Sequence, residues 1–458
     1  MGLTKPRRIH FVGIGGSGMS GIAEILINMG HKVQGSDLVS SDAVKHLQGL
    51  GASIFIGHDG GNVGEAEVVV ISSAVGVDNP EVIAAREKKI PVIPRAEMLG
   101  ELMRMKEGIA VAGAHGKTTA STFLATILAE AGLDPTVIIG GRVKRFGSGA
   151  RLGKGEYLVA EADESDGSFL TLNPTIAVIT NIDAEHLDYF GTKENIEAAF
   201  FKFCDAVPFF GATIACGDDP VLRSFAPRMN KKFLTYGFSK DCDLVVHDYK
   251  ATGFGSTFRV SDASGELGIV EFRLPGRHMA LNALAAIQTA LFLGVGFDAA
   301  AKALNSFGGI ARRSEIKGEK NGALVIDDYG HHPNEIRATV RSIRESCGER
   351  RIITLFQPHR YSRTRDCLKE FFSAFDDTDY LLLTPIYPAG EKPIEGINSR
   401  LIYDGVKASG HKNVFLIETE NEVQKWLKEN LRENDVLLTL GAGDVYRQGE
   451  KFLQNGNG

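Results

Sequence analysis

The sequence predicts an α/β fold organised in three domains. Three successive segments each repeat a short apolar run, a turn and a helix-like stretch, a rhythm typical of parallel sheets covered by helices. The chain has 458 residues, which is too long for one hydrophobic core and suits about three domains of ordinary size. Its 43% hydrophobic and 24% charged residues are typical of a soluble globular protein.

Apolar runs bounded by turn residues mark the expected strands of each segment. In residues 1–106 they lie at 9–12, 32–35, 68–72 and 90–93, with a helix from the first turn to about residue 30. In residues 107–311 they lie at 109–112, 157–162 and 176–182, followed by runs at 244–246, 257–260 and 269–274 that are typical of added antiparallel strands. In residues 312–458 they lie at 323–326, 352–356, 380–384, 414–417 and 436–440.

The most informative stretch is A-G-A-H-G-K-T-T at residues 112–119, between an expected strand and a helix-like stretch at 121–131. Glycines let backbone N–H groups face an anion, Lys117 reaches phosphate oxygens, and a threonine hydroxyl can bind Mg²⁺. The full phosphate-loop pattern has a glycine where Val111 stands, so this loop is a shortened variant; a glycine-rich turn with a chance lysine is the alternative. The candidate phosphate-binding residues are Gly113, Ala114, His115, Gly116, Lys117, Thr118 and Thr119.

A second glycine turn, G-I-G-G-S-G at residues 13–18, follows the first expected strand. With Asp37 about 20 residues further on, it matches the dinucleotide-binding pattern, in which a diphosphate lies at a helix N-terminus. The pattern requires a diphosphate but no nicotinamide, so a UDP-sugar fits it equally well; close strand–helix packing is the structural alternative. The candidate residues are Gly13, Gly15, Gly16, Ser17, Gly18 and Asp37.

Acidic clusters follow two further strands of the central segment. The run E-A-D-E-S-D at 161–166 offers Glu161, or its neighbour Glu164, as a ligand for the Mg²⁺ of a nucleotide. The run N-I-D-A-E-H-L-D at 181–188 offers His186 for a second cation or for positioning a phosphate. A structural histidine is the alternative.

Two polar clusters follow strands of the last segment, D-D-Y-G-H-H-P at 327–333 and Q-P-H-R-Y-S-R at 357–363. The carboxyl ends of parallel strands form one crevice, so we expect the clusters to face each other. Arg360 and Arg363, at a helix start, would bind a carboxylate and the charge that develops on a phosphate. Solvated surface arginines are the alternative.

Composition excludes several classes of partner. The net charge of −6 and the pI near 6.1 give no basic surface for nucleic acid. Five scattered cysteines without C-x-x-C spacing indicate thiols in a reducing compartment. No apolar run is long enough to span a membrane and the start of the chain lacks a signal-peptide pattern, so a cytoplasmic location is expected.

Taken together, these residues resemble the Mur ligase family of peptidoglycan synthesis. The resemblance extends over segments in the family's order, at 13–20, 113–119, 161–170, 181–188, 274–282, 312–315, 327–333 and 357–364. It implies an N-terminal Rossmann-like domain for a UDP-sugar at 1–106, a central ATP-binding domain at 107–311, and a C-terminal Rossmann-like domain at 312–458 that brings the amino acid.

The resemblance also implies roles for single residues. Lys117 would hold the ATP phosphates, with Thr118 and Glu161 on one Mg²⁺ and His186 on a second. Asn282 would meet the adenine and Arg313 would lie near the nucleotide, although Met279 stands where family members carry asparagine. The residues that would bind the amino acid and the transferring phosphate are Tyr329, His331, Arg360 and Arg363. His331 or a nearby carboxylate would take the proton of the amine.

Within the family, the chain resembles the branch that joins L-alanine to the lactoyl carboxylate of UDP-N-acetylmuramate through an acyl phosphate. Branches that add later amino acids carry a carbamylated lysine where this chain has Phe200. Ligases that recycle a murein tripeptide are the nearest alternative, and an NAD-dependent dehydrogenase or a non-catalytic nucleotide-binding protein is more remote. We therefore expect ATP, two Mg²⁺ ions and these two substrates, in a monomer or homodimer.

Overall fold

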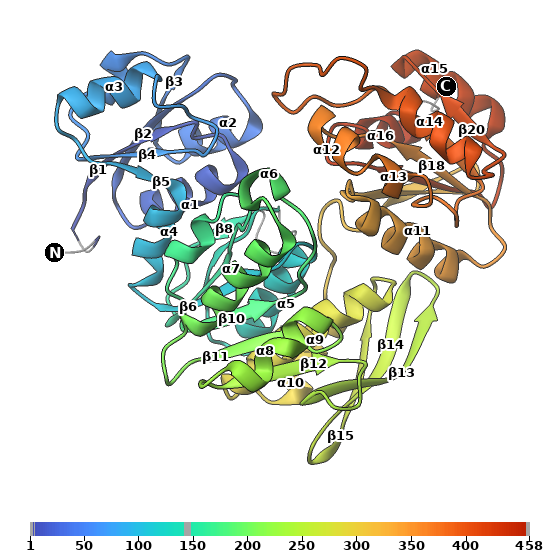
Figure 1. The fold of residues 1–458 in the computed structure, drawn as a ribbon, viewed down its shortest axis with the longest axis horizontal. Coiled ribbons are helices and arrows are strands. Elements are labelled where there is room, and N and C mark those ends of the chain that lie inside the picture. The colour runs from blue at the N-terminus through green and yellow to red at the C-terminus, as the bar shows by residue number, and fades with distance from the viewer. Residues whose placement is uncertain (1–2, 4, 142–147, 455–458) are drawn as a thin grey trace. The chain divides into compact units, whose positions relative to one another are not determined.

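The computed structural model describes residues 3, 5–141 and 148–454, which form sheets of five, ten and six strands in chain order (Figure 1). By the contacts between residues, the chain divides into two compact units. The larger unit comprises residues 1–247, 259–270 and 281–307, and the smaller comprises 248–258, 271–280 and 308–458. The first sheet therefore lies in the larger unit and the third sheet in the smaller.

The first sheet is parallel and has the strand order β3-β2-β1-β4-β5. Its strands are β1 (Arg8–Val12), β2 (Lys32–Asp37), β3 (Ser53–Ile56), β4 (Val68–Ile71) and β5 (Val92–Pro94). Its helices are α1 (Ser17–Asn28), α2 (Asp42–Gly49), α3 (Pro80–Glu87) and α4 (Arg95–Met103). The order reverses at β1, so the glycine turn after β1 lies at the position where open α/β sheets bind ligands. The mostly exposed edge strand β3 was not expected from the sequence, because it lacks a buried apolar run.

The second sheet has the order β15-β14-β13-β12-β11-β10-β6-β9-β7-β8. Its strands are β6 (Glu107–Ala112), β7 (Thr136–Ile138), β8 (Ala150–Arg151), β9 (Tyr157–Glu161), β10 (Ile176–Ile179), β11 (Ala212–Cys216), β12 (Phe233–Gly237), β13 (Leu244–Thr252), β14 (Gly255–Asp262) and β15 (Gly265–Phe272). Because β6 pairs in parallel with both β9 and β10, the ends of these three strands lie together. This pairing brings the phosphate loop beside both acidic clusters.

The strands β13, β14 and β15 were expected to be antiparallel additions. Two residues join β13 to β14, and two join β14 to β15. Neighbouring strands with such short connections run antiparallel, as expected. The first of them, β13, nevertheless pairs in parallel with β12 through Tyr236 and Gly237. The strands β7, β8, β11 and β12 were not expected from the sequence, because they are short or rich in small and polar residues.

The third sheet has the order β16-β17-β21-β18-β19-β20. Its strands are β16 (Glu315–Lys320), β17 (Ala323–Asp328), β18 (Ile352–Phe356), β19 (Tyr380–Leu383), β20 (Val414–Leu416) and β21 (Val436–Leu440). Among these strands, β16 pairs antiparallel with β17, and the other pairings are parallel. Apolar clusters cover both faces of this sheet. The strand β21 lies between β17 and β18, so the two polar clusters flank the end of β21.

The remaining helices are α5 (Lys117–Glu130), α6 (Leu187–Phe190), α7 (Lys193–Asp205), α8 (Pro220–Phe225), α9 (Arg277–Phe292), α10 (Phe297–Asn305), α11 (Pro333–Cys347), α12 (Tyr361–Asp366), α13 (Leu368–Phe371), α14 (Ser399–Ala408), α15 (Glu420–Asn430) and α16 (Tyr446–Gln454). Helix α5 is buried along most of its length, which places the loop before it on a rigid support. Within the part of the chain that the structure describes, no helix combines the length and the apolar character needed to cross a membrane.

Candidate active site

The first glycine turn joins β1 to α1, whose N-cap residue is Gly16. Helix N-termini attract anions because the first-turn N–H groups have no partner inside the helix. Asp37, the last residue of β2, accepts hydrogen bonds from the Gly15 N–H at 2.8 Å and from the Val39 N–H at 3.1 Å. Asp37 therefore holds the turn in shape. The expected residues lie together here, although the side chain of Ser17 is outside the described part of the structure.

The phosphate loop joins β6 to α5, which begins at Lys117 rather than near residue 121 as expected. Gly116 has φ +84°, and a Cβ there would lie 2.5 Å from Asn282 Oδ1. Gly113 has φ +129°, and a Cβ there would overlap Thr180 Oγ1. Both positions therefore need glycine, for conformation and for space. The contact also places Asn282, the expected adenine ligand, directly against the phosphate loop.

The loop is hydrogen-bonded to the segment that follows β10. The Asn181 side chain accepts from the His115 N–H and donates to the His115 carbonyl, both at 2.9 Å. Thr180 Oγ1 donates to the same carbonyl at 2.6 Å, and His115 Nε2 lies 3.1 Å from Asp183 Oδ2. This segment leads into His186, so the loop and the expected second-cation residue share one hydrogen-bonded support.

Lys117 points back over its own loop. Its Nζ donates to the carbonyls of Gly113 and Ala114 and lies 2.8 Å from Glu164 Oε1. Burial by itself would lower the pKa of Lys117, but the adjacent Glu164 carboxylate raises it, so the ammonium stays charged. A phosphate that approaches this loop would meet a fixed, half-buried cation.

A group of side chains suited to a cation lies beside Lys117. Ligand atoms of Glu164, Glu185 and His186 lie within 4.8 Å of one another. Glu164 is 3% exposed, burial raises its pKa to about 7, and its Oε2 is buried without a hydrogen-bond partner in the described residues. Carboxylate oxygens with an imidazole suit Mg²⁺ or Mn²⁺, so these residues fit the expected metal. The structure thus brings Glu164, the alternative to Glu161, together with His186.

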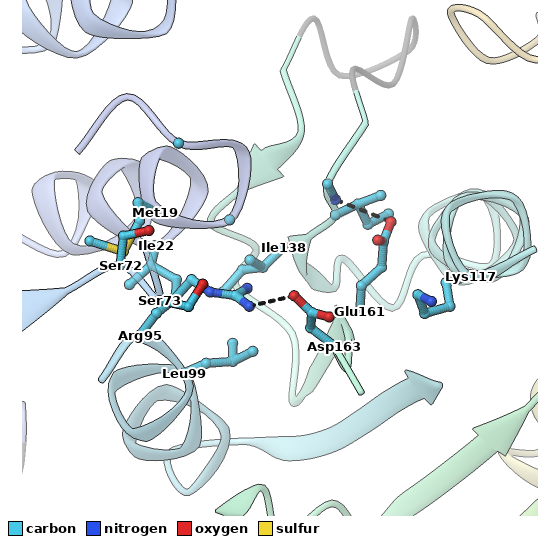
Figure 2. A pocket seen from close by; sticks show the side chains of 14 residues that line it. Met19, Ile22, Ser72, Ser73, Arg95, Leu99, Lys117, Ile138, Glu161 and Asp163 are labelled. Atoms are coloured by element: carbon cyan, nitrogen blue, oxygen red, sulfur yellow. Dashed lines mark hydrogen bonds and ion pairs between the residues drawn. The ribbon is translucent and has the colours of Figure 1, made fainter. Parts of the chain in front are cut away.

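A cavity of about 330 Å³ in the larger unit is lined by residues of the first glycine turn and by Lys117 of the phosphate loop (Figure 2). Gly16, Gly18 and Arg95 line it on the side of the first sheet, and Lys117 and Glu161 on the side of the second. Glu161 accepts a hydrogen bond from the Gly140 N–H at 3.1 Å. One cavity therefore joins the expected diphosphate turn to the expected ATP loop and one of the candidate metal ligands.

In the smaller unit, the clusters after β17 and β18 meet. The rings of Tyr329 and His331 lie 5.5 Å apart, and those of His331 and His359 5.6 Å apart. Arg363 donates to His359, and Arg360, which has φ +71°, precedes α12. A non-glycine residue in this conformation is strained, as is common at functional sites.

His331 and His359 are neutral at physiological pH. Burial lowers the pKa of His331 to about 3 and the pKa of His359 to about 4, with the Arg363 guanidinium adding to both effects. Arg313, the expected nucleotide contact, lies with its guanidinium 5.3 Å from the ring centre of Tyr329. The expected nucleotide and amino-acid residues of this unit are therefore neighbours.

Three features of the site were not predicted from the sequence. Arg95 lines the cavity but belongs to no motif. Glu185 stands beside His186 but was not assigned a role. The turn after β21, G-A-G-D at 441–444, joins the edge formed by the two clusters, and Gln357 Oε1 accepts from the N–H groups of Asp444 and Val445. Its two glycines after an apolar strand were a signal that could have found it.

Three family models match: "Mur ligase family, catalytic domain" at 8–107, "Mur ligase middle domain" at 111–290, and "Mur ligase, glutamate ligase domain" at 312–443. The chain belongs to the Mur ligase family. The resemblance inferred from the motifs is thereby confirmed, and with it the three-domain α/β fold class.

Similar proteins of this ligase family cover almost the entire chain. The UDP-N-acetylmuramate–L-alanine ligase of Geobacter sp. (strain M21) is 51% identical over 98% of this chain and 97% of its own length. That of Trichlorobacter lovleyi is 50% identical over 98% of each chain. The crystal structure of the UDP-N-acetylmuramate–alanine ligase of Thermotoga maritima superimposes with a TM-score of 0.83 at 29% identity, covering 98% of both chains.

Proposed function

We propose that this Mur ligase joins L-alanine to the lactoyl carboxylate of UDP-N-acetylmuramate with ATP as the driving reactant, in peptidoglycan precursor synthesis. The observation that carries the proposal is the cavity that the diphosphate turn and Lys117 line together. A nucleotide sugar bound at the turn would extend its acid toward the γ-phosphate of ATP at Lys117. Relatives of that name at about half sequence identity over the whole chain support the same assignment.

The reaction has two balanced steps. A lactoyl carboxylate oxygen attacks the γ-phosphorus of ATP, the bond to the bridging oxygen breaks, and ADP leaves with an acyl phosphate formed. The alanine amine then attacks the acyl carbon, the carbon–oxygen bond to phosphate breaks, and the amine loses a proton. Lys117 opposes the charge on the transferring phosphate, and the chain mainly aligns three substrates.

The nucleotide and its metal would be held by the larger unit. We assign Lys117 and the first-turn N–H groups of α5 to the phosphates, and Asn282, which contacts the loop, to the nucleotide. Two Mg²⁺ ions would supply further positive charge: Thr118 and Glu161 for one, and His186 with Glu164 for the other. The arrangement of Glu164, Glu185 and His186 supports the second site.

The amino acid would be held by the smaller unit. Arg360 and Arg363 would bind the alanine carboxylate and the transferring phosphate, with Tyr329 and His331 beside them. Because burial lowers the pKa of His331 to about 3, it is a neutral but weak base. We propose that the three domains span residues 1–106, 107–311 and 312–458. We also propose a cytoplasmic location, where ATP and nucleotide sugars are made.

The proposal is tested by phosphate release from ATP and UDP-N-acetylmuramate. The assay offers alanine, serine, glycine and the murein tripeptide in turn. Alanine-dependent release supports the proposal, and release with the tripeptide alone would make the chain a recycling ligase. ATP binding without any amino-acid-dependent release would indicate a non-catalytic protein. Turnover of NADH, followed by absorbance, would indicate a dehydrogenase.

A further inference from the structure

Arg95 occupies a defined place in the cavity of the larger unit. It is the first residue of α4, its side chain is 18% exposed, and its guanidinium points into the cavity (Figure 2). Nη2 donates to Asp163 Oδ2 at 2.8 Å. The same guanidinium lies against the first turn of α1, because a Cβ at Gly18 would overlap Nη1 and lie 3.1 Å from Cζ. One side chain therefore connects the glycine turn to the acidic cluster after β9.

The ion pair leaves part of the arginine available. A guanidinium carries five N–H donors in a planar fork, and Asp163 accepts from Nη2. This contact, at 2.8 Å, fixes the orientation of the fork. Nη1 lies beside the α1 N-terminus, where Gly16, Gly18, Ser72 and Ser73 line the cavity.

We propose that Arg95 binds the diphosphate of the nucleotide sugar at the glycine turn, and that Asp163 is the positioning residue that orients its guanidinium. The inference rests on the proposed function and names a binding residue that no motif indicates. The helix N-terminus and the guanidinium present convergent donors to the same anion. Asp163 lies between Glu161 and Glu164, so the contact ties the phosphates of one substrate to the segment around Lys117.

The test is a direct binding measurement on the full chain without ATP. Calorimetric titrations with UDP-N-acetylmuramate, UDP, UMP and uridine are compared for the parent chain, Arg95→Ala, Arg95→Lys and Asp163→Ala. Arg86→Ala is the matched control, because Arg86 is an exposed arginine on α3. The thermal midpoint of each variant shows that it is folded, and Arg95→Lys keeps the charge if the alanine variant is unstable.

A charge-assisted contact predicts that Arg95→Ala weakens UDP and UDP-N-acetylmuramate binding by about 10- to 100-fold, with Arg95→Lys in between. Uridine binding is unchanged. Asp163→Ala weakens UDP binding by about threefold, which is less than the effect of Arg95→Ala, because the guanidinium remains but loses the contact that orients it.

Three outcomes overturn the inference. The first is UDP binding by Arg95→Ala with the affinity of the parent. The second is an equal loss of affinity for uridine and UDP in Arg95→Ala. The third is a loss of UDP affinity in Asp163→Ala as large as in Arg95→Ala, which would mean that the ion pair has a structural role. Phosphate release with alanine is measured separately on the parent chain. If the parent chain releases no phosphate with alanine, the proposed function is wrong, whereas the binding measurement still decides the role of Arg95.

Discussion

The Nζ of Lys117 lies 2.8 Å from Oε1 of Glu164, while the other oxygen of that carboxylate is buried without a hydrogen-bond partner in the described residues. The positive charge of Lys117 is thus balanced by the negative charge of Glu164 within the protein. Oε1 also lies 3.9 Å from Nε2 of His186, and Glu164 forms with Glu185 and His186 a group of side chains that could hold a cation. A cation bound by this group would compete with Lys117 for the carboxylate, which would release the ammonium toward a phosphate.

Replacing Lys117 tests its role toward the phosphates. Lys117→Ala removes a half-buried cation that would stabilise the charge on the transferring phosphate, so ADP release should fall by at least about 100-fold. Binding of UDP-N-acetylmuramate, measured by calorimetry, should stay within about twofold of the parent, because the glycine turn is intact. Turnover near the parent rate would refute this assignment.

Replacing Glu164 tests the cation site. Glu164→Gln keeps the shape of the side chain but removes its charge, so the Mg²⁺ concentration for half-maximal activity should rise by about 10-fold or more. The exposed Glu156→Gln serves as control and should leave the Mg²⁺ dependence unchanged. An unchanged Mg²⁺ requirement in Glu164→Gln, together with a raised one in Glu161→Gln, would assign the metal to Glu161 alone.

Replacing Arg363 tests amino-acid binding in the smaller unit. Loss of a charge-assisted contact in Arg363→Ala should raise the KM for alanine by about 10- to 100-fold and the KM for ATP by far less. Arg365→Ala on the same helix is the control, since Arg365 is exposed and pairs with Asp366. Equal increases in both KM values would show that Arg363 has a structural role.

The pair formed by His115 and Asp183 predicts energetic coupling between the phosphate loop and the segment of His186. In a double-mutant cycle with His115→Ala and Asp183→Ala, kcat/KM for ATP should show a coupling energy of about 1 kcal/mol. The two losses should therefore not add. Strict additivity would mean that the two side chains act independently on the loop.

The buried Glu81 predicts a pH dependence of stability. Burial would raise the pKa of Glu81, but hydrogen bonds from His10, Ser36 and Asn62 lower it from 4.5 to about 2. A lowered carboxyl pKa stabilises the folded state above the unfolded-state value, and the effect disappears as pH falls through the folded-state value.

Glu81→Gln should therefore lower the free energy of unfolding at pH 7 by about 2 to 3 kcal/mol, measured by urea denaturation. The difference should shrink as pH falls from 4.5 toward 2. Glu87→Gln, at the exposed end of α3, is the control and should be close to neutral. A difference that persists unchanged at low pH would contradict the assigned ionisation.

The positions of the main site residues were predictable because each lies directly after an apolar strand. Strand ends in parallel sheets share an edge, and this rule placed Lys117 beside the acidic clusters and His331 beside the Q-P-H-R-Y-S-R segment. The start of α5 was predicted too late, because Lys117, Thr118 and Thr119 look like loop residues until their N–H groups are seen in the first turn of a helix.

The sequence by itself determined the α/β class, the order of the three sheets and the two glycine loops, because periodicity and turn chemistry are local properties of the chain. Only the tertiary structure decided that Glu164 pairs with Lys117, that Asn282 contacts Gly116, and that Arg95 reaches Asp163. Those contacts join residues far apart in the chain, and the packing of strands and helices sets which side chains meet there. The sequence places strand ends at a shared edge, but it does not specify which side chains at that edge touch.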